Sequence, residues 1–183
     1  MATSPLSVTG IVLAAGAGTR AGGPKALLRM PDGTPWLELA CAVLRESGCD
    51  RIVAVLGARV RTARPLVPAW AEVVVAEDWE AGMSASLRAG LAAASGDAAL
   101  VTLVDLPGLP TAVGLRVMAA QGALRQAVYS GEPGHPVFIA AEHWDAATTS
   151  LEGDTGARRY LVEHGVAEIE CGDLWHGHDR NFG

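Results

Sequence analysis

Residues Ile11 to Leu28 read Ile-Val-Leu-Ala-Ala-Gly-Ala-Gly-Thr-Arg-Ala-Gly-Gly-Pro-Lys-Ala-Leu-Leu, an apolar run followed at once by a loop rich in glycine. The apolar residues from Gly10 to Ala14 predict a buried strand. Because glycine has no Cβ, backbone N–H groups in such a loop can approach a ligand closely and point toward it. Arg20 and Lys25 add two positive charges. The stretch therefore predicts a polyphosphate site whose glycines are Gly16, Gly18, Gly22 and Gly23.

Two other phosphate-binding loops fit these residues less well. Gly16-x-Gly18-x-x-Ala21 matches a loose dinucleotide fingerprint, but that motif opens straight into a helix, whereas this chain meets three prolines between residues 24 and 35. The next expected strand also ends Val-Leu-Gly, with no acidic residue to bind a ribose hydroxyl. The Walker pattern fails because Pro24 stands where its lysine is required. An ordinary strand-to-helix loop is the remaining alternative.

Elsewhere the chain alternates between short apolar runs and segments in which apolar residues recur at helical spacing. Strands are expected at residues 52–56, 73–75, 98–104, 127–129, 137–139 and 167–171. Helices are expected at residues 35–47, 82–94, 111–121, 140–148 and 155–164. This alternation predicts an α/β fold in which helices cover both faces of a sheet. In such sheets ligands gather at the carboxyl ends of the strands.

The composition limits the classes of protein to which the chain can belong. Its 183 residues suggest a single domain over residues 1–183, with a loose N-terminal end at residues 1–7. Half of the residues are hydrophobic and 19% are charged, which argues against disorder. The net charge of −6 argues against general nucleic-acid binding, and no apolar run reaches membrane-spanning length. Scattered cysteines suggest reduced, buried thiols and a cytoplasmic protein; they are Cys41, Cys49 and Cys171.

A second strand end carries a carboxylate. The apolar run of residues 100–104 is followed by Asp105-Leu-Pro107. A carboxylate just beyond a buried strand is well placed to hold Mg²⁺ on a nucleotide, because Mg²⁺ prefers oxygen ligands. The alternative is an aspartate that opens a turn before the proline.

Three further stretches combine glycine with polar residues. Gly82 and Ser84 stand where a helix is expected to begin, so N–H groups there could face a nucleotide; a helix capped by Ser84 is the alternative. His135, in a Gly-His-Pro-Val run expected to form a turn, could donate to a substrate oxygen or form a structural hydrogen bond. Asp154 and Arg158 lie in a Gly-Asp-Thr-Gly-Ala-Arg run, which by itself is typical of a helix cap with a solvated arginine.

The pattern Leu-Ala-Ala-Gly-x-Gly-x-Arg-x-Gly-x-Pro-Lys resembles the signature loop of nucleotidyltransferases. It is most similar to that of the molybdenum cofactor cytidylyltransferases among the MobA-like proteins. Four more stretches resemble that family in the same order: Trp-x-x-Gly-Met-x-x-Ser-Leu, Asp-Leu-Pro, Gly-His-Pro-Val and Gly-Asp-x-Gly-Ala-Arg. The likeness covers residues 8–181. It implies a Rossmann-like nucleotidyltransferase domain, with a mostly parallel twisted sheet and helices on both faces.

By this resemblance, the reaction joins CTP to molybdenum-loaded molybdopterin and gives the cytosine dinucleotide cofactor and pyrophosphate. A molybdoenzyme is one candidate client. Arg20 and Lys25 would neutralise the triphosphate, and Asp105 would bind Mg²⁺. The nucleotide site would comprise Leu13, Ala14, Ala15, Gly16, Gly18, Gly82 and Ser84. The pterin substrate would be bound by His135, Asp154 and Arg158.

The C-terminal end departs from the family pattern. The family ends with Asp-x-Asp-Thr-Pro-Glu-Asp and a helix, whereas this chain ends His-Asp-Arg-Asn-Phe-Gly. Asp179 and Asn181 keep the two ligand-type positions and could complete the Mg²⁺ site, but the Thr-Pro pair and the following helix are missing. His176, His178 and Asp179 could instead bind a transition metal.

Three alternatives remain for the function. The same chemistry could use GTP or a sugar phosphate, although Ala15 favours CTP because the guanylyl relatives usually have glycine there. A non-catalytic protein could bind or deliver the pterin cofactor. The third alternative is a nicotinamide-dependent oxidoreductase, which the loose dinucleotide fingerprint permits.

Overall fold

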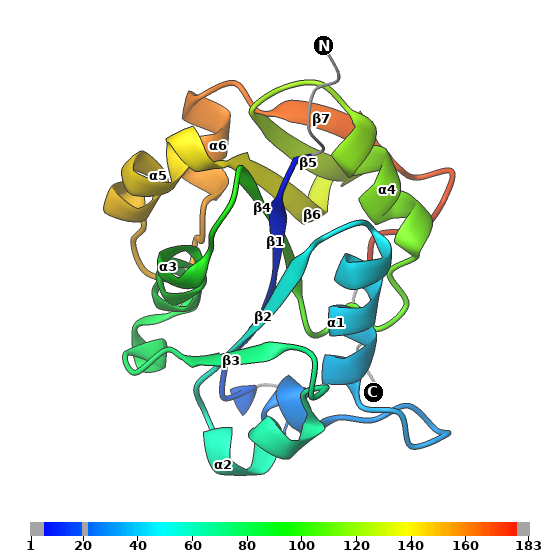
Figure 1. Cartoon of the computed structure of the whole chain (residues 1–183), viewed down its shortest axis with the longest axis vertical. Helices are drawn as coiled ribbons and strands as arrows, with labels where there is room; N and C mark the ends of the chain where they lie inside the picture. The colour runs from blue at the N-terminus through cyan, green and yellow to red at the C-terminus, as the bar shows by residue number, and fades with distance from the viewer. Residues whose placement is uncertain (1–5, 20–21, 179–183) are drawn as a thin grey trace.

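Figure 1 shows a central sheet between helices, in a computed structural model that describes residues 6–19 and 22–178. The sheet has seven strands in the order β3-β2-β1-β4-β6-β5-β7. The strands are β1 (Val8–Ala14), β2 (Arg51–Leu56), β3 (Glu72–Val75), β4 (Ala98–Leu103), β5 (Leu124–Tyr129), β6 (Glu132–Ala140) and β7 (Ala167–Glu170).

The sheet is mostly parallel, as the resemblance to nucleotidyltransferases implies. β1 pairs in parallel with β2 and β4, β2 pairs with β3, and β5 pairs with β7. β6 runs antiparallel to both of its neighbours, β4 and β5. In the described part of the chain, β6 is thus the one reversed strand, and it joins the two parallel halves of the sheet.

Helices bury both faces of the sheet, so the expected α/β architecture is confirmed. α1 and α4 pack on one face, and α3, α5 and α6 pack on the other (Figure 1). These helices are α1 (Trp36–Glu46), α3 (Met83–Ala93), α4 (Thr111–Ala119), α5 (Trp144–Ser150) and α6 (Arg158–Glu163). Shorter pieces are α2 (Val60–Ala63) and the 3₁₀ turns η2 (Lys25–Leu27), η3 (Arg64–Leu66), η4 (Trp79–Ala81) and η5 (Ala141–His143).

β1 is buried along its whole length, which explains its unbroken apolar sequence. Its side chains alternate between the two layers. Val12 packs with α1 and α4, whereas Ile11 and Leu13 pack with α3. Gly10 lies under α1, where an added Cβ would come within 2.9 Å of the Leu44 Cβ. A glycine is therefore needed for α1 to lie this close to the strand.

β6 is longer than the sequence predicts, and the turn expected around the Gly-His-Pro run is wrong. The chain reverses instead at Ser130 and Gly131, whose φ angles are 55° and 82°. Tyr129 and Glu132 are register partners, so only two residues connect β5 to β6. Two-residue hairpin loops favour such positive φ angles, because their twist then matches that of the strands. His135 consequently lies in a strand, and the peptide bond that follows it is cis.

The three cysteines are buried and form no disulfide, as expected. Loss of hydration raises the pKa of the Cys41 and Cys49 thiols to about 12, so both stay protonated at neutral pH. Within residues 6–19 and 22–178, no helix combines the length and the apolar character needed to cross a membrane.

Replacing Gly10 by alanine should destabilise the fold. The new Cβ would lie 2.7 Å from Ile52 Cδ1 and 2.9 Å from the Leu44 Cβ, which the α1 backbone holds in place. Overpacking of this kind costs about 1–3 kcal/mol, so urea denaturation should give a free energy of unfolding that is lower by this amount. Gly16→Ala is the matched control, because a Cβ there meets no atom within 4 Å. Wild-type stability of Gly10→Ala would contradict the close packing of α1 on β1.

Candidate active site

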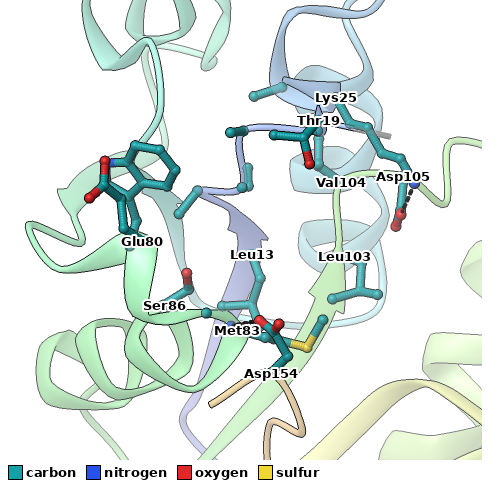
Figure 2. A pocket seen from close by; sticks show the side chains of 18 residues that line it. Leu13, Thr19, Lys25, Glu80, Met83, Ser86, Leu103, Val104, Asp105 and Asp154 are labelled. Atoms are coloured by element: carbon teal, nitrogen blue, oxygen red, sulfur yellow. Dashed lines mark hydrogen bonds and ion pairs between the residues drawn. The ribbon is translucent and has the colours of Figure 1, made fainter. Parts of the chain in front are cut away.

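A cavity lies at the carboxyl ends of β1 and β4, where ligands are expected in such a sheet. Its volume is about 410 Å³, and we call it the first cavity. Figure 2 shows Lys25 and Asp105 at one end and Glu80 at the other. The walls are formed by residues 13–19, 25–26 and 103–105, together with Trp79, Glu80, Gly82, Met83, Ser86 and Asp154.

The glycine loop folds back on itself. The Gly23 amide donates to the Gly18 carbonyl at 3.1 Å. Gly18 has a φ of +60°, and a Cβ on it would lie 1.9 Å from the Gly23 carbonyl oxygen, so only glycine fits. Gly16 differs, because a Cβ on it would point into open space, so its backbone is accessible to a ligand. The predicted site residue Arg20 lies outside the described residues.

Lys25 and Asp105 form an ion pair at one end of the first cavity. Lys25 Nζ lies 2.7 Å from Asp105 Oδ2, and both side chains are largely buried. The Asp105 Oδ1 atom is buried and makes no hydrogen bond with any described residue. A buried carboxylate oxygen is costly unless a donor or a cation meets it. The Asp105 carboxylate therefore fits as one oxygen ligand of Mg²⁺.

The other expected metal ligands, Asp179 and Asn181, lie outside residues 6–19 and 22–178. Within those ranges, no three His, Cys, Asp or Glu side chains are arranged to hold a metal ion. His176 and His178 lie within the described residues. The His178 amide donates to His176 Nδ1 at 3.0 Å, so this ring nitrogen is already engaged.

The C-terminal segment packs near the loop that carries Asp105. The Trp175 ring meets the Tyr129 ring edge-on, with 5.5 Å between their centroids. A Cβ on Gly177 would lie 2.4 Å from Tyr129 Cγ, and a Cβ on Gly108 would lie 3.6 Å from Trp175 Nε1. The described C-terminal segment therefore lies beside the loop that carries Asp105.

The start of α3 is held by a loop from far along the chain. The Met83 amide donates to Asp154 Oδ1 at 3.2 Å, and the Ser84 amide donates to the Gly153 carbonyl at 3.0 Å. The Gly82 amide donates to the Trp79 carbonyl at 3.1 Å. The amides of Gly82 and Ser84 are therefore both engaged and are not available to a nucleotide, contrary to the expectation from the sequence. Asp154 caps α3 rather than the helix that follows it, α6, which has no side-chain cap.

Ser86, rather than Ser84, reaches the first cavity. Ser84 is 2% exposed and lines neither of the cavities described here. Residues three and four apart lie on the same helix face, so Ser86 shares the face of Gly82 and Met83. This separation of three and four residues from Met83 and Gly82 is the sequence signal by which Ser86 could be predicted to line the cavity. Eight other residues of the cavity wall have no role predicted from the sequence: Ala17, Thr19, Ala26, Trp79, Glu80, Met83, Leu103 and Val104.

A second cavity, of about 400 Å³, lies beside the first and shares Leu13, Met83 and Asp154 with it. His135 and Arg158 line this second cavity, so the structure brings together the three residues expected to bind the acceptor substrate. Most of its remaining wall is aliphatic, from side chains that include Leu87, Val101, Val137, Ile139 and Leu161.

His135 is a half-buried residue of β6 that is neutral at physiological pH. Burial lowers its pKa to about 4, although the negative charge of Asp105 acts in the opposite direction. Its carbonyl accepts a 2.6 Å hydrogen bond from the Tyr129 hydroxyl. A neutral imidazole has one N–H donor and one acceptor nitrogen, so His135 can donate to a substrate oxygen in the second cavity.

Known proteins resemble this chain along nearly its whole length. Residues 10–168 match the family model of the MobA-like NTP transferase domain. The chain is 41% identical to the nicotine blue oxidoreductase of Paenarthrobacter nicotinovorans, over 94% of this chain and 91% of that protein. It is 31% identical to a molybdenum cofactor guanylyltransferase of Burkholderia vietnamiensis, over 91% of this chain and 87% of that protein. Rv0371C of Mycobacterium tuberculosis H37Rv, solved in complex with manganese, aligns with a TM-score of 0.74 and 28% identity, over 90% of this chain and 88% of that one.

The low pKa of His135 predicts a loss of stability on acidification. An unfolded histidine titrates near 6.5 and the folded His135 near 4, so between these values the unfolded chain binds one more proton. The free energy of unfolding therefore falls as the pH drops from 6.5 to 4, by up to about 1.4 kcal/mol per pH unit. His135→Gln should flatten this loss, as measured by urea denaturation across the interval, whereas His164→Gln, at an exposed position, should not. Parallel curves for wild type and His135→Gln would contradict a half-buried, neutral His135.

Proposed function

Because the chain belongs to the MobA-like NTP transferase family, we propose that it transfers CMP from CTP to the terminal phosphate of a molybdopterin-type cofactor and releases pyrophosphate. The observation that carries this proposal is the pair of adjoining cavities with a common wall. The first has a glycine loop, a lysine and a carboxylate, which suit a nucleoside triphosphate with a divalent metal. The second has a neutral histidine and an arginine among aliphatic side chains, which suit a heterocycle that carries a phosphate.

In the proposed reaction, an oxygen of the acceptor phosphate attacks the α-phosphorus of CTP. The bond between that phosphorus and the bridging oxygen of the β-phosphate breaks, and pyrophosphate leaves with the electron pair. Such a step depends on positioning and charge stabilisation rather than on a covalent enzyme intermediate. The accessible backbone of Gly16 and the ammonium of Lys25 would bind the β- and γ-phosphates, and Arg20 would add a second cation.

Asp105 is the residue proposed to hold Mg²⁺, with Asp179 and Asn181 as further ligands. Its two oxygens have different surroundings, since Oδ2 accepts from Lys25 while Oδ1 is buried without a donor among the described residues. Mg²⁺ would supply charge neutralisation on the phosphates. The manganese in the related Rv0371C structure supports the use of a divalent cation.

On the acceptor side, Arg158 is proposed to bind a phosphate oxygen of the cofactor, because a guanidinium matches phosphate geometry with two parallel hydrogen bonds. Neutral His135 would donate to the same group or to the pterin. The aliphatic wall between them would exclude water from the heterocycle. A molybdoenzyme is the proposed client of the product, and the buried free thiols support a cytoplasmic location.

The choice of CTP rests on Ala15, which lines the first cavity where β1 opens into the loop. Its methyl group narrows the space that glycine would leave for a larger purine. The carbonyls of Leu13 and Ala15 accept hydrogen bonds from the amides of Val104 and Ala58, at 3.1 and 2.9 Å, so they are less able to bind the base. The hydroxyl of Ser86 is therefore the proposed polar contact to the base.

One observation favours a second candidate function. The relative with 41% identity is named an oxidoreductase, whereas the guanylyltransferase is 31% identical. In this case the glycine loop would bind the phosphates of a nicotinamide nucleotide, and the second cavity would hold the compound that exchanges a hydride with it.

A thermal-shift screen separates these candidates, because a ligand of the folded state raises its stability by mass action. The screen contains CTP, GTP, ATP, UTP and NAD, each with Mg²⁺, and is followed by a pyrophosphate-release assay with the pterin cofactor. Stabilisation by a nucleoside triphosphate with pyrophosphate release supports the transferase. Stabilisation by NAD alone supports the oxidoreductase, and binding of the pterin without turnover supports a delivery protein.

Lys25 is the only lysine in the sequence, and its ammonium is proposed to meet the triphosphate. Lys25→Ala should leave the fold intact and lower pyrophosphate release roughly tenfold or more, which corresponds to about 1.4 kcal/mol of activation free energy. Arg29→Ala is the control, because Arg29 donates to the Gly33 carbonyl at 2.7 Å and lines neither cavity. Wild-type turnover of Lys25→Ala would remove this lysine from the site.

The nucleotide preference can be measured by calorimetry with Mg²⁺ present. CTP should bind roughly tenfold more tightly than GTP, or better, and Ala15→Gly should narrow this difference without reversing it. The narrowing should be partial because pocket volume alone discriminates by about 1–3 kcal/mol per small group. Equal affinity of the wild type for CTP and GTP would overturn the cytidylyl assignment and leave that of a nucleotidyltransferase.

A further inference from the structure

The loop that carries Asp154 is attached to α3 at three points. Its acceptors are one side chain and two carbonyls, and all three partners are donors of the same helix. The contacts are Met83 N–H to Asp154 Oδ1 at 3.2 Å, Ser84 N–H to the Gly153 carbonyl at 3.0 Å, and Arg88 Nη2 to the Leu151 carbonyl at 3.0 Å. The loop is therefore fixed to the wall of the first cavity although it also forms the wall of the second.

Glycines on both sides make this contact close. Gly82 has a φ of +104°, and a Cβ on it would lie 2.3 Å from Asp154 Oδ1 and 2.8 Å from the Gly153 carbonyl oxygen. Gly156 has a φ of +54°, and a Cβ on it would lie 3.3 Å from Met83 Sδ. Any larger residue at position 82 would push the loop away from the helix. The loop that carries Asp154 and the start of α3 therefore pack in close contact, which glycine at residues 82 and 156 allows.

Asp154 lies where the two cavities meet. Figure 2 shows it beside Met83 at the edge of the first cavity, and both residues also line the second. The amides at the start of a helix carry partial positive charge, so a carboxylate there is stabilised by attraction as well as by the hydrogen bond. The exposed carboxylate of Asp154 therefore has a hydrogen-bond partner within the protein, at the boundary between the two cavities.

We propose that Asp154 is a positioning residue that couples the two cavities by capping α3, and that it does not act by direct contact with the acceptor. The cap holds residues 151–158 against the helix whose residues 82, 83 and 86 line the first cavity. Without this hydrogen bond the loop is no longer held against α3, and Met83 and Asp154, which line both cavities, lose their fixed positions. This inference rests on the proposed two-substrate reaction.

The effect on nucleotide affinity has opposite signs under the two possible roles of Asp154. If it were only a negative charge on the wall, its removal would strengthen binding of an anionic nucleotide by reducing repulsion. If it positions α3, its removal weakens binding, because the cavity wall loses its anchor. Asparagine keeps a cap acceptor and removes the charge, whereas alanine removes both. The two substitutions therefore separate the roles.

The test combines calorimetry of CTP and of GTP, each with Mg²⁺, with hydrogen exchange of the free protein. Asp154→Ala should weaken binding of the preferred nucleotide about threefold or more, and Asp154→Asn should bind at least as tightly as wild type. Exchange of the Met83 and Ser84 amides should be faster in Asp154→Ala and unchanged in Asp154→Asn. Glu152→Gln is the control, because it removes an exposed charge from the same loop without touching α3.

Tighter or unchanged nucleotide binding by Asp154→Ala would overturn the proposal, as would unchanged exchange at residues 83 and 84. If the wild type binds neither CTP nor GTP, the proposed function fails instead. In that case the hydrogen exchange still decides whether Asp154 holds the start of α3, because that measurement needs no ligand.

Discussion

Leu13 and Leu103 are register partners in the parallel pair β1 and β4, and the Val104 amide donates to the Leu13 carbonyl at 3.1 Å. The carboxyl ends of the two strands therefore lie side by side at one edge of the sheet. The glycine loop and the loop with Asp105 both begin at that edge. This pairing is what brings Lys25 within 2.7 Å of Asp105, a residue 80 positions later in the sequence. Every other part of the first cavity is placed relative to these two loops, including the start of α3, which packs on the opposite side of β1 from α1.

The glycines of the site fall into two groups that only the structure distinguishes. A Cβ at residue 18 or 82 would overlap protein atoms at 1.9 or 2.3 Å, so these glycines permit the chain to pack against itself. A Cβ at residue 16 would meet nothing, so this glycine leaves room for something that is not protein. The same residue type thus builds the cavity at two positions and keeps it open at another. Among the glycines that line the first cavity, Gly16 meets this criterion of an open Cβ position, and Gly22 and Gly23 of the same loop also meet it outside the lining.

The sequence predicts the sheet and its edge well, because continuous burial of parallel strands leaves long apolar runs such as that of β1. It also predicts Lys25 and Asp105 at one edge, since both follow strand ends. It fails at β6, where prolines beside His135 suggest a turn although the hairpin reverses earlier. It also assigns Asp154 to a local cap, whereas the carboxylate binds an amide 71 residues away. Contacts at such separation depend on tertiary packing and leave no local pattern.

The electrostatics of the first cavity explain why the described side chains are an incomplete site for a polyphosphate. The charged residues that line the cavity are one lysine, Lys25, and three carboxylates, Glu80, Asp105 and Asp154, so their summed formal charge is −2. Capping of α3 offsets part of the charge of Asp154, and Lys25 offsets that of Asp105, but neither leaves surplus positive charge. An anion in this cavity needs cations beyond those lining residues. Arg20 in the glycine loop and a divalent metal at Asp105 are the two sources that we propose. Binding of the nucleotide and binding of the metal should therefore depend on each other.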